Sequence, residues 1–255
     1  MDKDFEKLLN EAKKLGADYI ATGHYARIID GQLARAIDLN KDQSYFLAYV
    51  NKEKFANVLF PIGELEKPIV RKIALENDLA TAEKKDSTGI CFIGERNFTK
   101  FLENYLPNQP GKIINIETKE IVGEHIGLMY YTIGQRRGLN LGGNSEKSYV
   151  VEKDLENNIL YVATGDENNY LYSNEAIIEN FNFLTNKRPT TCTCKFRYRS
   201  KDVPINVEYL EGNNLKLTYK QAKSVTPGQF CVLYQDNLCL GGGIIKEVQK
   251  TKINY

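Results

Sequence analysis

The sequence predicts an α/β segment followed by two β-rich segments. Up to about residue 106, apolar side chains recur mostly at helical spacing around one short apolar strand. After Gly111 the chain changes to short β-type runs separated by Gly, Asn and Asp turns. From about residue 170, apolar and polar residues alternate, with a turn every ten or so residues, which is typical of a small antiparallel barrel. We therefore expect domains over 1–106, 107–169 and 170–255.

The first segment begins as half of an α/β repeat. Residues 3–15 carry apolar side chains three and four apart, which predicts an amphipathic helix ended by Gly16. "DYIAT" at 18–22 predicts a short buried strand, and Gly23 and His24 follow its C-terminal end. Ligands of open α/β sheets bind beyond that end of the strands, although a lone histidine is often structural. The turn is a candidate ligand site.

Three further helices are expected before the change of texture. Residues 41–65 are expected to be mostly helical, with Pro61 ending the helix. Residues 66–79 carry a proline near a predicted helix start. The loop that contains Cys91 comes next, and "NFTKFLENYLPNQPG" predicts a last helix, with Asn97 or Thr99 as its N-cap.

The composition is that of an ordinary globular protein. The chain has 255 residues, of which 42% are apolar and 26% charged, and a net charge of +1. This balance neither requires nor excludes a nucleic-acid partner, because binding depends on local patches. No apolar run is long enough to span a membrane, and the charged N-terminus lacks a signal core. We expect a cytoplasmic protein without a membrane partner.

Cys91 lies in the string "DSTGICFIGER" (86–96), and two interpretations are open. The thiol is either a buried apolar side chain beside Ile90 and Phe92, or a reactive group whose pKa is lowered by Arg96 or helix amides. Spacing alone does not choose between them. The pair Cys192 and Cys194 is expected to be structural, since a zinc site needs about four ligands. No metal site is expected.

Two polar strings are candidates for binding a polymer. "LNKDQSYFL" (39–47) is either a solvated helix start or a cluster of hydrogen-bonding side chains. "TNKRPTTCTCKFRYRSK" (185–201) holds six basic residues and no acid. A strand there would place Arg197 and Arg199 on one face and Tyr198 on the other. Such a patch suits phosphates and stacked bases, or else protects an exposed edge strand by charge.

Taken together, several strings resemble the tRNA-specific 2-thiouridylases (tRNA-uridine 2-sulfurtransferases). The resemblance spans residues 15–234, and its motifs are "LGADYIATGHYAR", "DLNKDQSYFL", "FPIGELEKPIVRKIA", "DSTGICFIGERNFTKFL", "MYYTIGQRRGL", "CKFRYRS" and "VTPGQFCVLY". It implies a partial adenine-nucleotide α-hydrolase-like (PP-loop ATPase) α/β domain that lacks its first half. A small central β-rich domain and a C-terminal antiparallel β-barrel that binds tRNA would follow.

The resemblance also implies roles for particular residues. Cys91 matches the cysteine that carries a persulfide, and Gly23 matches a backbone position that contacts ATP. The residues that match tRNA contacts of the family are His24, Lys41, Asp42, Gln43, Arg197, Tyr198 and Gln229.

The implied reaction is ATP-dependent, with Mg²⁺ expected, and acts on the wobble uridine of a tRNA anticodon stem-loop. Adenylation of the uridine C2 oxygen makes it a leaving group, and persulfide sulfur on Cys91 then attacks C2. A second cysteine forms a disulfide that releases the product, and a persulfide sulfur-carrier protein is the expected donor. The target base must leave the anticodon stack.

The sequence departs from the family pattern at its start. No "SGGVDS"-type loop precedes residue 16, and no cysteine precedes Cys91. We therefore expect a truncated chain whose α/β sheet has exposed edges. The alternative function is that of a catalytically inactive remnant that binds tRNA.

Overall fold

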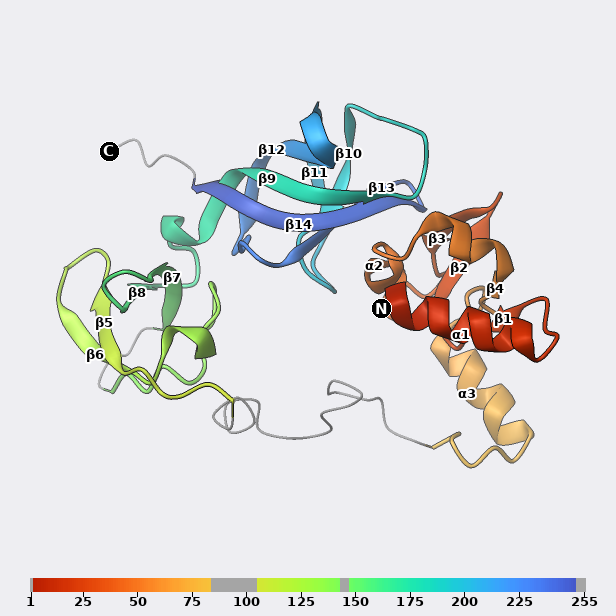
Figure 1. Cartoon of the computed structure of the whole chain (residues 1–255). Coiled ribbons are helices and arrows are strands. Elements are labelled where there is room, and N and C mark those ends of the chain that lie inside the picture. Colours follow the sequence, from red (N-terminus) through yellow and green to blue (C-terminus); the bar gives the residue numbers. More distant parts are fainter. Residues whose placement is uncertain (1, 84–104, 143–146, 251–255) are drawn as a thin grey trace. The chain divides into compact units, whose positions relative to one another are not determined.

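The structure is a computed structural model that describes residues 2–83, 105–142 and 147–250. The chain divides into two compact units (Figure 1). Unit 1 contains Met1–Lys84, Glu175–Lys220 and Pro227–Val248, and unit 2 contains Lys85–Asn174, Gln221–Thr226 and Gln249–Tyr255. The three domain ranges expected from the sequence stay a prediction.

The N-terminal part of unit 1 contains short elements around one small core. Its elements are α1 (Asp2–Lys14), β1 (Ile20–Ala21), β2 (Ala26–Ile29), β3 (Gln32–Arg35), α2 (Ser44–Leu47), the 3-10 helix η1 (Lys52–Asn57), β4 (Val58–Leu59) and α3 (Lys67–Glu76). The predicted helices over 3–15 and 66–79 are confirmed by α1 and α3. The strand expected over 18–22 is present but is reduced to β1.

The expectation of a mostly helical segment over 41–65 is wrong. The segment forms the single turn α2, the 3-10 helix η1 and the strand β4. Asn51 explains the first break, because its side chain accepts a hydrogen bond from the backbone N–H of Glu53 and starts η1 anew. Val58 and Leu59 then pair with β1, so sheet pairing replaces the last predicted turns.

Strands β1 and β4 form a two-stranded parallel sheet, with Ile20 opposite Val58 and Ala21 opposite Leu59. Parallel sheets are normally covered on both faces and continued on both sides. Here Phe5 of α1 and Phe55 of η1 cover the buried side, while the Leu59 side chain stays exposed. Among the described residues each of these two strands has one strand neighbour, which agrees with the sequence-based expectation of exposed sheet edges.

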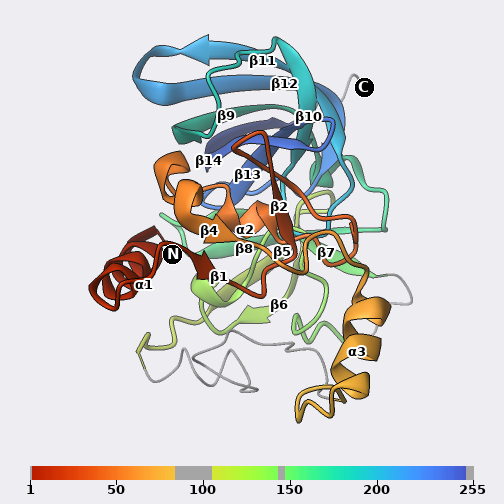
Figure 2. The same cartoon turned by 90° about the vertical axis from the view of Figure 1, so that its right-hand side faces the viewer.

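The rest of unit 1 is built around a closed antiparallel barrel, seen from two directions in Figures 1 and 2. The strand order is β13-β10-β11-β12-β9-β14, and the pairing of β13 with β14 closes the ring. The hairpin β2–β3 joins the same sheet where Ala34 lies opposite Leu238 of β14. The barrel elements are β9 (Tyr172–Phe183), β10 (Thr191–Lys195), β11 (Val203–Leu210), η4 (Glu211–Asn213), β12 (Asn214–Lys223), β13 (Phe230–Gln235) and β14 (Leu238–Lys250).

Unit 2 contains a four-stranded sheet in the order β6-β5-β8-β7. Its core includes Ile113, Val150, Leu160 and Val162, all of which are buried. Its elements are β5 (Gly111–Asn115), β6 (Ile121–His125), η2 (Leu128–Tyr130), β7 (Ser148–Asp154), β8 (Ile159–Thr164) and η3 (Asn169–Leu171). The β-rich texture predicted after Gly111 is confirmed. The helix predicted after Asn97 lies largely outside the described residues.

None of the helices in the described part of the chain has the length and apolar character needed to cross a membrane.

Candidate nucleic-acid interface

The Gly23–His24 turn and the 41–43 segment lie side by side because Gln43 joins them. The backbone N–H of Gln43 donates to the Tyr25 carbonyl at 2.8 Å, and the Tyr25 N–H donates to Gln43 Oε1 at 3.0 Å. Two candidate strings that lie 18 residues apart therefore form one local structure. The Gln43 side chain therefore stabilises the turn through a hydrogen bond inside the protein.

Gly23 leaves open space at the end of β1, since a side-chain carbon there would meet nothing within 4 Å. His24 beside it is half-buried, and its Nδ1 lies 2.8 Å from Thr22 Oγ1. Its ring also packs near Phe5 and Phe60. Burial lowers the pKa of His24 below its usual value, so the imidazole is neutral at pH 7. The turn thus offers a neutral ring and an approachable backbone.

Asp42 is buried, with 4% of its surface exposed, and its carboxylate is bound within the protein. It accepts hydrogen bonds from the Ala36 and Ser44 N–H groups, both at 3.2 Å, and from Ser44 Oγ at 2.9 Å. Ser44 Oγ also lies 3.1 Å from the Tyr234 hydroxyl of the barrel. These bonds fix the start of α2 against β13, so Asp42 positions the residues that follow it.

Arg35 adds a second connection between the N-terminal part and the barrel. Its guanidinium lies 3.7 Å from the centre of the Tyr234 ring and forms 3.0 Å contacts with the Asp202 carboxylate. Arg35 is buried, while the carboxylate is partly exposed. The charged partner and the aromatic face compensate for the burial of the guanidinium, although Arg35 Nε itself is buried without a hydrogen-bond partner.

Side chains from α2 and the barrel form what we call the aromatic cluster: Tyr45, Phe46, Tyr49, Tyr198 and Phe230. The Phe46 and Tyr198 ring centres lie 4.4 Å apart, and those of Tyr49 and Phe230 lie 5.2 Å apart. The Tyr45 hydroxyl donates to the Phe230 carbonyl at 2.8 Å. Phe46 and Phe230 nevertheless remain 38% and 42% exposed. The cluster is therefore a surface feature rather than part of the core.

Arg197 and Gln229 meet beside this cluster. Arg197 Nε donates to Gln229 Oε1 at 3.1 Å, and both side chains are half-buried. Burial lowers the pKa of Arg197, although an arginine keeps its charge at neutral pH. The structure therefore brings Gln43, Arg197, Tyr198 and Gln229 close to one set of aromatic rings.

The predicted strand alternation across Arg197, Tyr198 and Arg199 is wrong. β10 ends at Lys195, and a turn follows in which the Ser200 N–H and hydroxyl both donate to the Arg197 carbonyl. Arg199 has a φ of 65°, a left-handed conformation that no strand contains. Its guanidinium lies 5.3 Å from the centre of the Tyr198 ring, so it lies beside the aromatic cluster.

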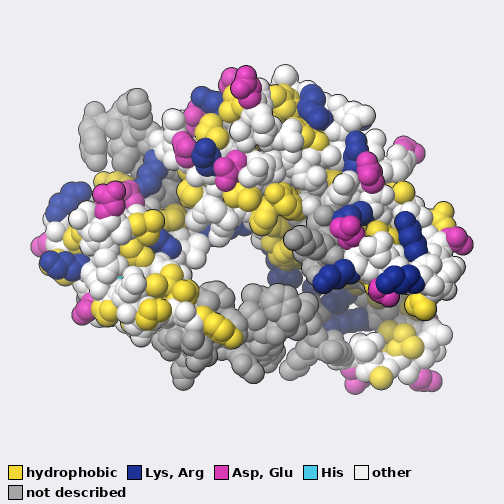
Figure 3. Space-filling view, in the orientation of Figure 1, with side chains coloured by type: hydrophobic (Ala, Val, Ile, Leu, Met, Phe, Trp, Pro, Cys, Tyr) yellow, Lys and Arg dark blue, Asp and Glu magenta, His cyan; other side chains and the backbone are white. Residues whose placement is uncertain are grey.

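Charge on the rest of the visible surface is mixed. Figure 3 shows Lys and Arg side chains interspersed with Asp and Glu side chains on the visible face, and the net charge of the chain is +1. The run of basic residues at 195–201 therefore differs from the mixed charge of the visible face. Arginines next to exposed aromatic rings are the arrangement that single-stranded nucleic acids favour, since phosphates and base faces can be bound together.

Comparison with known proteins decides the family. Residues 3–95 match the family model "tRNA methyl transferase HUP domain", residues 99–164 match "tRNA methyl transferase PRC-barrel domain", and residues 173–245 match "Aminomethyltransferase beta-barrel domain". The chain is 50% identical to the tRNA-specific 2-thiouridylase MnmA of Mesoplasma florum, over 96% of this chain and 70% of that protein. This chain belongs to the tRNA-specific 2-thiouridylase family.

Two other relatives give the same result. The 2-thiouridylase of Mycoplasmopsis pulmonis is 51% identical over 98% of this chain and 69% of its own length. That of Metamycoplasma arthritidis is 54% identical over 92% of this chain and 64% of its own length. The identity thus extends over nearly all of this 2-thiouridylase chain and about two thirds of each relative.

The sequence-based site omitted most of the aromatic cluster. Tyr45 and Phe46 stand inside the quoted string "LNKDQSYFL", and Phe230 follows Gln229 directly. The one feature of the sequence that could have pointed to these aromatic residues is their position next to the predicted polar residues. The sequence does not predict that these rings lie together in the fold. Tyr45 and Phe230, for example, are 185 residues apart, yet the Tyr45 hydroxyl binds the Phe230 carbonyl.

Cys91, the residue expected to carry sulfur, lies outside the described residues of this 2-thiouridylase. The four described cysteines are unlike a reactive thiol. Cys194, Cys231 and Cys239 are buried, and burial raises the pKa of half-buried Cys192 to about 12. Burial also raises the pKa of Cys194 and Cys239, so these two thiols and Cys192 carry almost no thiolate at neutral pH. This agrees with the structural role predicted for Cys192 and Cys194.

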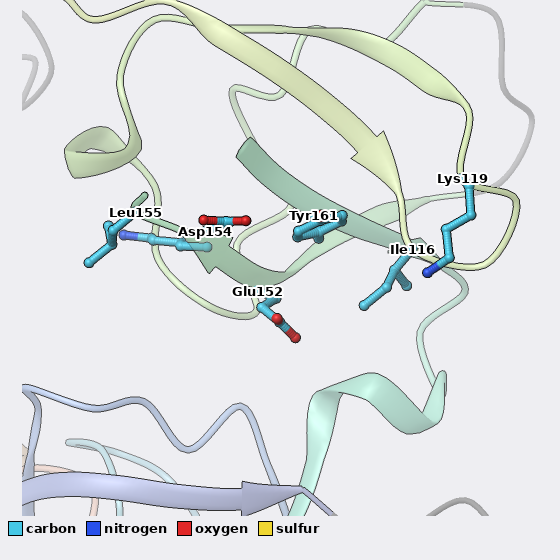
Figure 4. A pocket seen from close by; sticks show the side chains of 7 residues that line it. Ile116, Lys119, Glu152, Asp154, Leu155 and Tyr161 are labelled. Atoms are coloured by element: carbon cyan, nitrogen blue, oxygen red, sulfur yellow. The ribbon is translucent and has the colours of Figure 1, made fainter. Parts of the chain in front are cut away.

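Unit 2 of this family member has an open depression of about 560 Å³ (Figure 4). In Figure 4, Tyr161 lies between the Asp154–Leu155 turn and the side chains of Ile116 and Lys119. Burial lowers the pKa of Lys153, which also lines the depression. Among the described residues there is no group of His, Cys, Asp and Glu that could hold a metal ion.

Proposed function

We propose that this chain binds the anticodon stem-loop of tRNA at the aromatic cluster and acts in the ATP-dependent 2-thiolation of the wobble uridine. The supporting observation is the identity of about 50% to tRNA-specific 2-thiouridylases over nearly the whole chain. We propose a cytoplasmic location, because the proposed substrate is tRNA. His24, Lys41, Arg197, Tyr198 and Gln229 are the proposed tRNA contacts.

The chemistry of the aromatic cluster suits an RNA loop. Sequence-specific RNA recognition targets unpaired bases, which stack on aromatic side chains or on arginine planes. Exposed Phe46 and Phe230 supply such faces, while Arg197 and Arg199 supply charge for phosphates. Asp42 and Gln43 are assigned a positioning role, because their side-chain oxygens are bound to backbone N–H groups of the protein.

Sulfur transfer is assigned to Cys91. Its thiolate takes the terminal sulfur from a persulfide carrier, which leaves as a thiol, and the persulfide sulfur then attacks C2 of the uridine. ATP, as co-substrate with Mg²⁺, supplies the activation that turns the C2 oxygen into a leaving group. The open turn at Gly23 fits the close approach of such a ligand to the backbone. The activated oxygen leaves with AMP as C2 bonds to the sulfur. The thiol released from the persulfide donor then attacks the Sγ of Cys91, which breaks the sulfur–sulfur bond, leaves sulfur on C2 and forms a mixed disulfide between Cys91 and that thiol.

The direct test is to incubate the purified chain with tRNA, ATP and a low-molecular-weight persulfide. Digested tRNA is then analysed for 2-thiouridine by mass spectrometry. We expect 2-thiouridine that depends on both ATP and the persulfide. Binding of tRNA without any 2-thiouridine would contradict the catalytic part of the proposal.

A second candidate is a tRNA-binding protein without catalysis. It is favoured by the composition of the aromatic cluster, because Tyr45, Phe46, Tyr49, Tyr198 and Phe230 can stack on bases without a reactive thiol. A gel shift with tRNA that weakens with salt, occurs equally with Cys91→Ser, and is not followed by thiolation would support this candidate.

Arg197→Ala is expected to weaken binding of an anticodon stem-loop about tenfold and to reduce the salt slope of the affinity by about 1. The reason is the loss of one cation beside the aromatic cluster. Fluorescence anisotropy at several salt concentrations measures both quantities. Lys13→Ala removes the same charge from exposed α1 and serves as the control. Equal effects of the two variants would contradict a local role for Arg197.

A further inference from the structure

A second depression lies in unit 1, beside Tyr49 of the aromatic cluster. Its volume is about 390 Å³, near the lower end of the range of about 300–1,000 Å³ found for small-molecule sites. The described residues that line it carry no charge, and the main ones are Tyr49, Asn51, Asn180, Phe181, Asn182 and Asn213. The site is therefore small, neutral and rich in carboxamide groups.

The position of Tyr49 is fixed by Asn182. The Asn182 amide donates to the carbonyls of Ala48 and Val50, each at 3.0 Å, and these two residues flank Tyr49. The Tyr49 ring contacts Phe230 at an interplanar angle of 65° and also lines the depression. It is 38% exposed, so part of the ring is available to a ligand. A rigid ring at the edge of a cavity is a stacking platform.

Two of the asparagines have backbone conformations that favour this residue type. Asn180, inside strand β9, has a φ of 52°, and Asn213, the last residue of η4, has a φ of 59°; both residues are exposed. A carboxamide offers one acceptor and two donors, which is the pattern that pairs with the edge of a nucleobase. Their amide groups can thus read a base that rests on Tyr49.

Basic residues also lie near the depression, close to its lining residue Asn51. Lys52 directly follows Asn51, and its Nζ lies 3.4 Å from Asn186 Oδ1, which brings the 186–188 segment with Lys187 and Arg188 near it. Lys52 therefore lies next to the depression in the chain, while Arg197 and Arg199 lie beside the aromatic cluster to which Tyr49 belongs. Both sets of cations can bind phosphates of one RNA strand while one base of that strand turns into the depression.

We propose that the depression holds one unstacked nucleotide of the RNA loop, with its base on Tyr49 and its edge toward Asn180 and Asn213. This inference rests on the proposed function, because it extends the same RNA-binding surface. The bound nucleotide is distinct from the uridine that is modified, whose reaction is assigned to Cys91.

The test measures anisotropy with a labelled anticodon stem-loop and, separately, with a blunt duplex of the same stem. Tyr49→Ala is expected to weaken stem-loop binding about 5- to 100-fold without changing the salt slope, because a stacked base and no phosphate contact is lost. Tyr49→Phe keeps the ring and should bind nearly as the unmodified chain does. Duplex binding should not change in either variant.

The asparagines are tested by the double variant Asn180→Gly and Asn213→Gly, which keeps both backbone conformations because glycine adopts positive φ freely. We expect it to weaken stem-loop binding about fivefold or more. Asn140→Gly, at a φ of 51° in unit 2, is the matched control and should have no effect.

Two outcomes separate this inference from the proposed function. Stem-loop binding that is lowered by Arg197→Ala but unchanged by Tyr49→Ala and by the double glycine variant would overturn the nucleotide site alone. Absence of RNA binding by the unmodified chain would overturn both.

Discussion

Replacing Cys91 with serine is expected to abolish 2-thiouridine formation and to leave the affinity for tRNA unchanged. A serine hydroxyl has nearly the same size as the thiol but cannot carry a persulfide sulfur, so the transfer step has no donor. The aromatic cluster that is proposed to bind tRNA does not include residue 91. Mass spectrometry of digested tRNA and a parallel anisotropy titration measure the two properties separately.

Cys192→Ser is the control for this experiment. Cys192 is half-buried, and burial together with nearby Cys231 raises the pKa of its thiol to about 12. It therefore contributes almost no thiolate at neutral pH, and its replacement should leave thiolation unchanged. Continued 2-thiouridine formation by Cys91→Ser, or its loss in Cys192→Ser, would show that sulfur is assigned to the wrong residue.

Gly241→Ala is expected to lower the stability of unit 1 by roughly 3–5 kcal/mol, the sum of overpacking and backbone strain. A side-chain carbon at this position would lie 2.0 Å from the Asn182 carbonyl oxygen and 2.7 Å from a Phe181 ring carbon. Gly241 also has a φ of 140°, which side-chain-bearing residues rarely adopt. The clash is with backbone, so β9 and β14 would have to separate.

Urea unfolding followed by circular dichroism measures the change. Gly228→Ala is the matched control, since Gly228 has a φ of 82° but open space around it. Gly228→Ala should lower the free energy of unfolding by only about 1–2 kcal/mol, which is the contribution of backbone strain. If the two variants unfold at the same urea concentration, the close approach of β14 to β9 is not the cause of the lower stability of Gly241→Ala. Because Asn182 also holds the backbone around Tyr49, Gly241→Ala should weaken RNA binding as well.

Local patterns predicted those parts of the fold that local interactions determine. The spacing of apolar residues around Phe5 predicted α1, and Pro68 predicted the first turn of α3. The same reasoning failed at 41–65, because the pairing of Val58 with Ile20 is a contact between distant segments. It failed again at Arg199, whose left-handed backbone follows from a turn that contains no glycine or proline.

The candidate site shows the same division. The polar residues Gln43, Arg197 and Gln229 were identified from strings that resemble the family. Tyr198 was identified in the same way. Phe46 and Phe230 were not, since an exposed phenylalanine has no distinguishing spacing in the sequence. Only the folded chain shows that Phe46 touches Tyr198 and that Tyr45 reaches the Phe230 carbonyl.

Because Tyr45 binds a carbonyl 185 residues away, no excised peptide from either end of the chain could reproduce the aromatic cluster. RNA affinity should therefore vanish at the same denaturant concentration at which the barrel melts. An RNA titration would then measure the fraction of molecules that are folded. A destabilised variant would bind less RNA because fewer molecules are folded, although the folded molecules keep the same contacts with RNA.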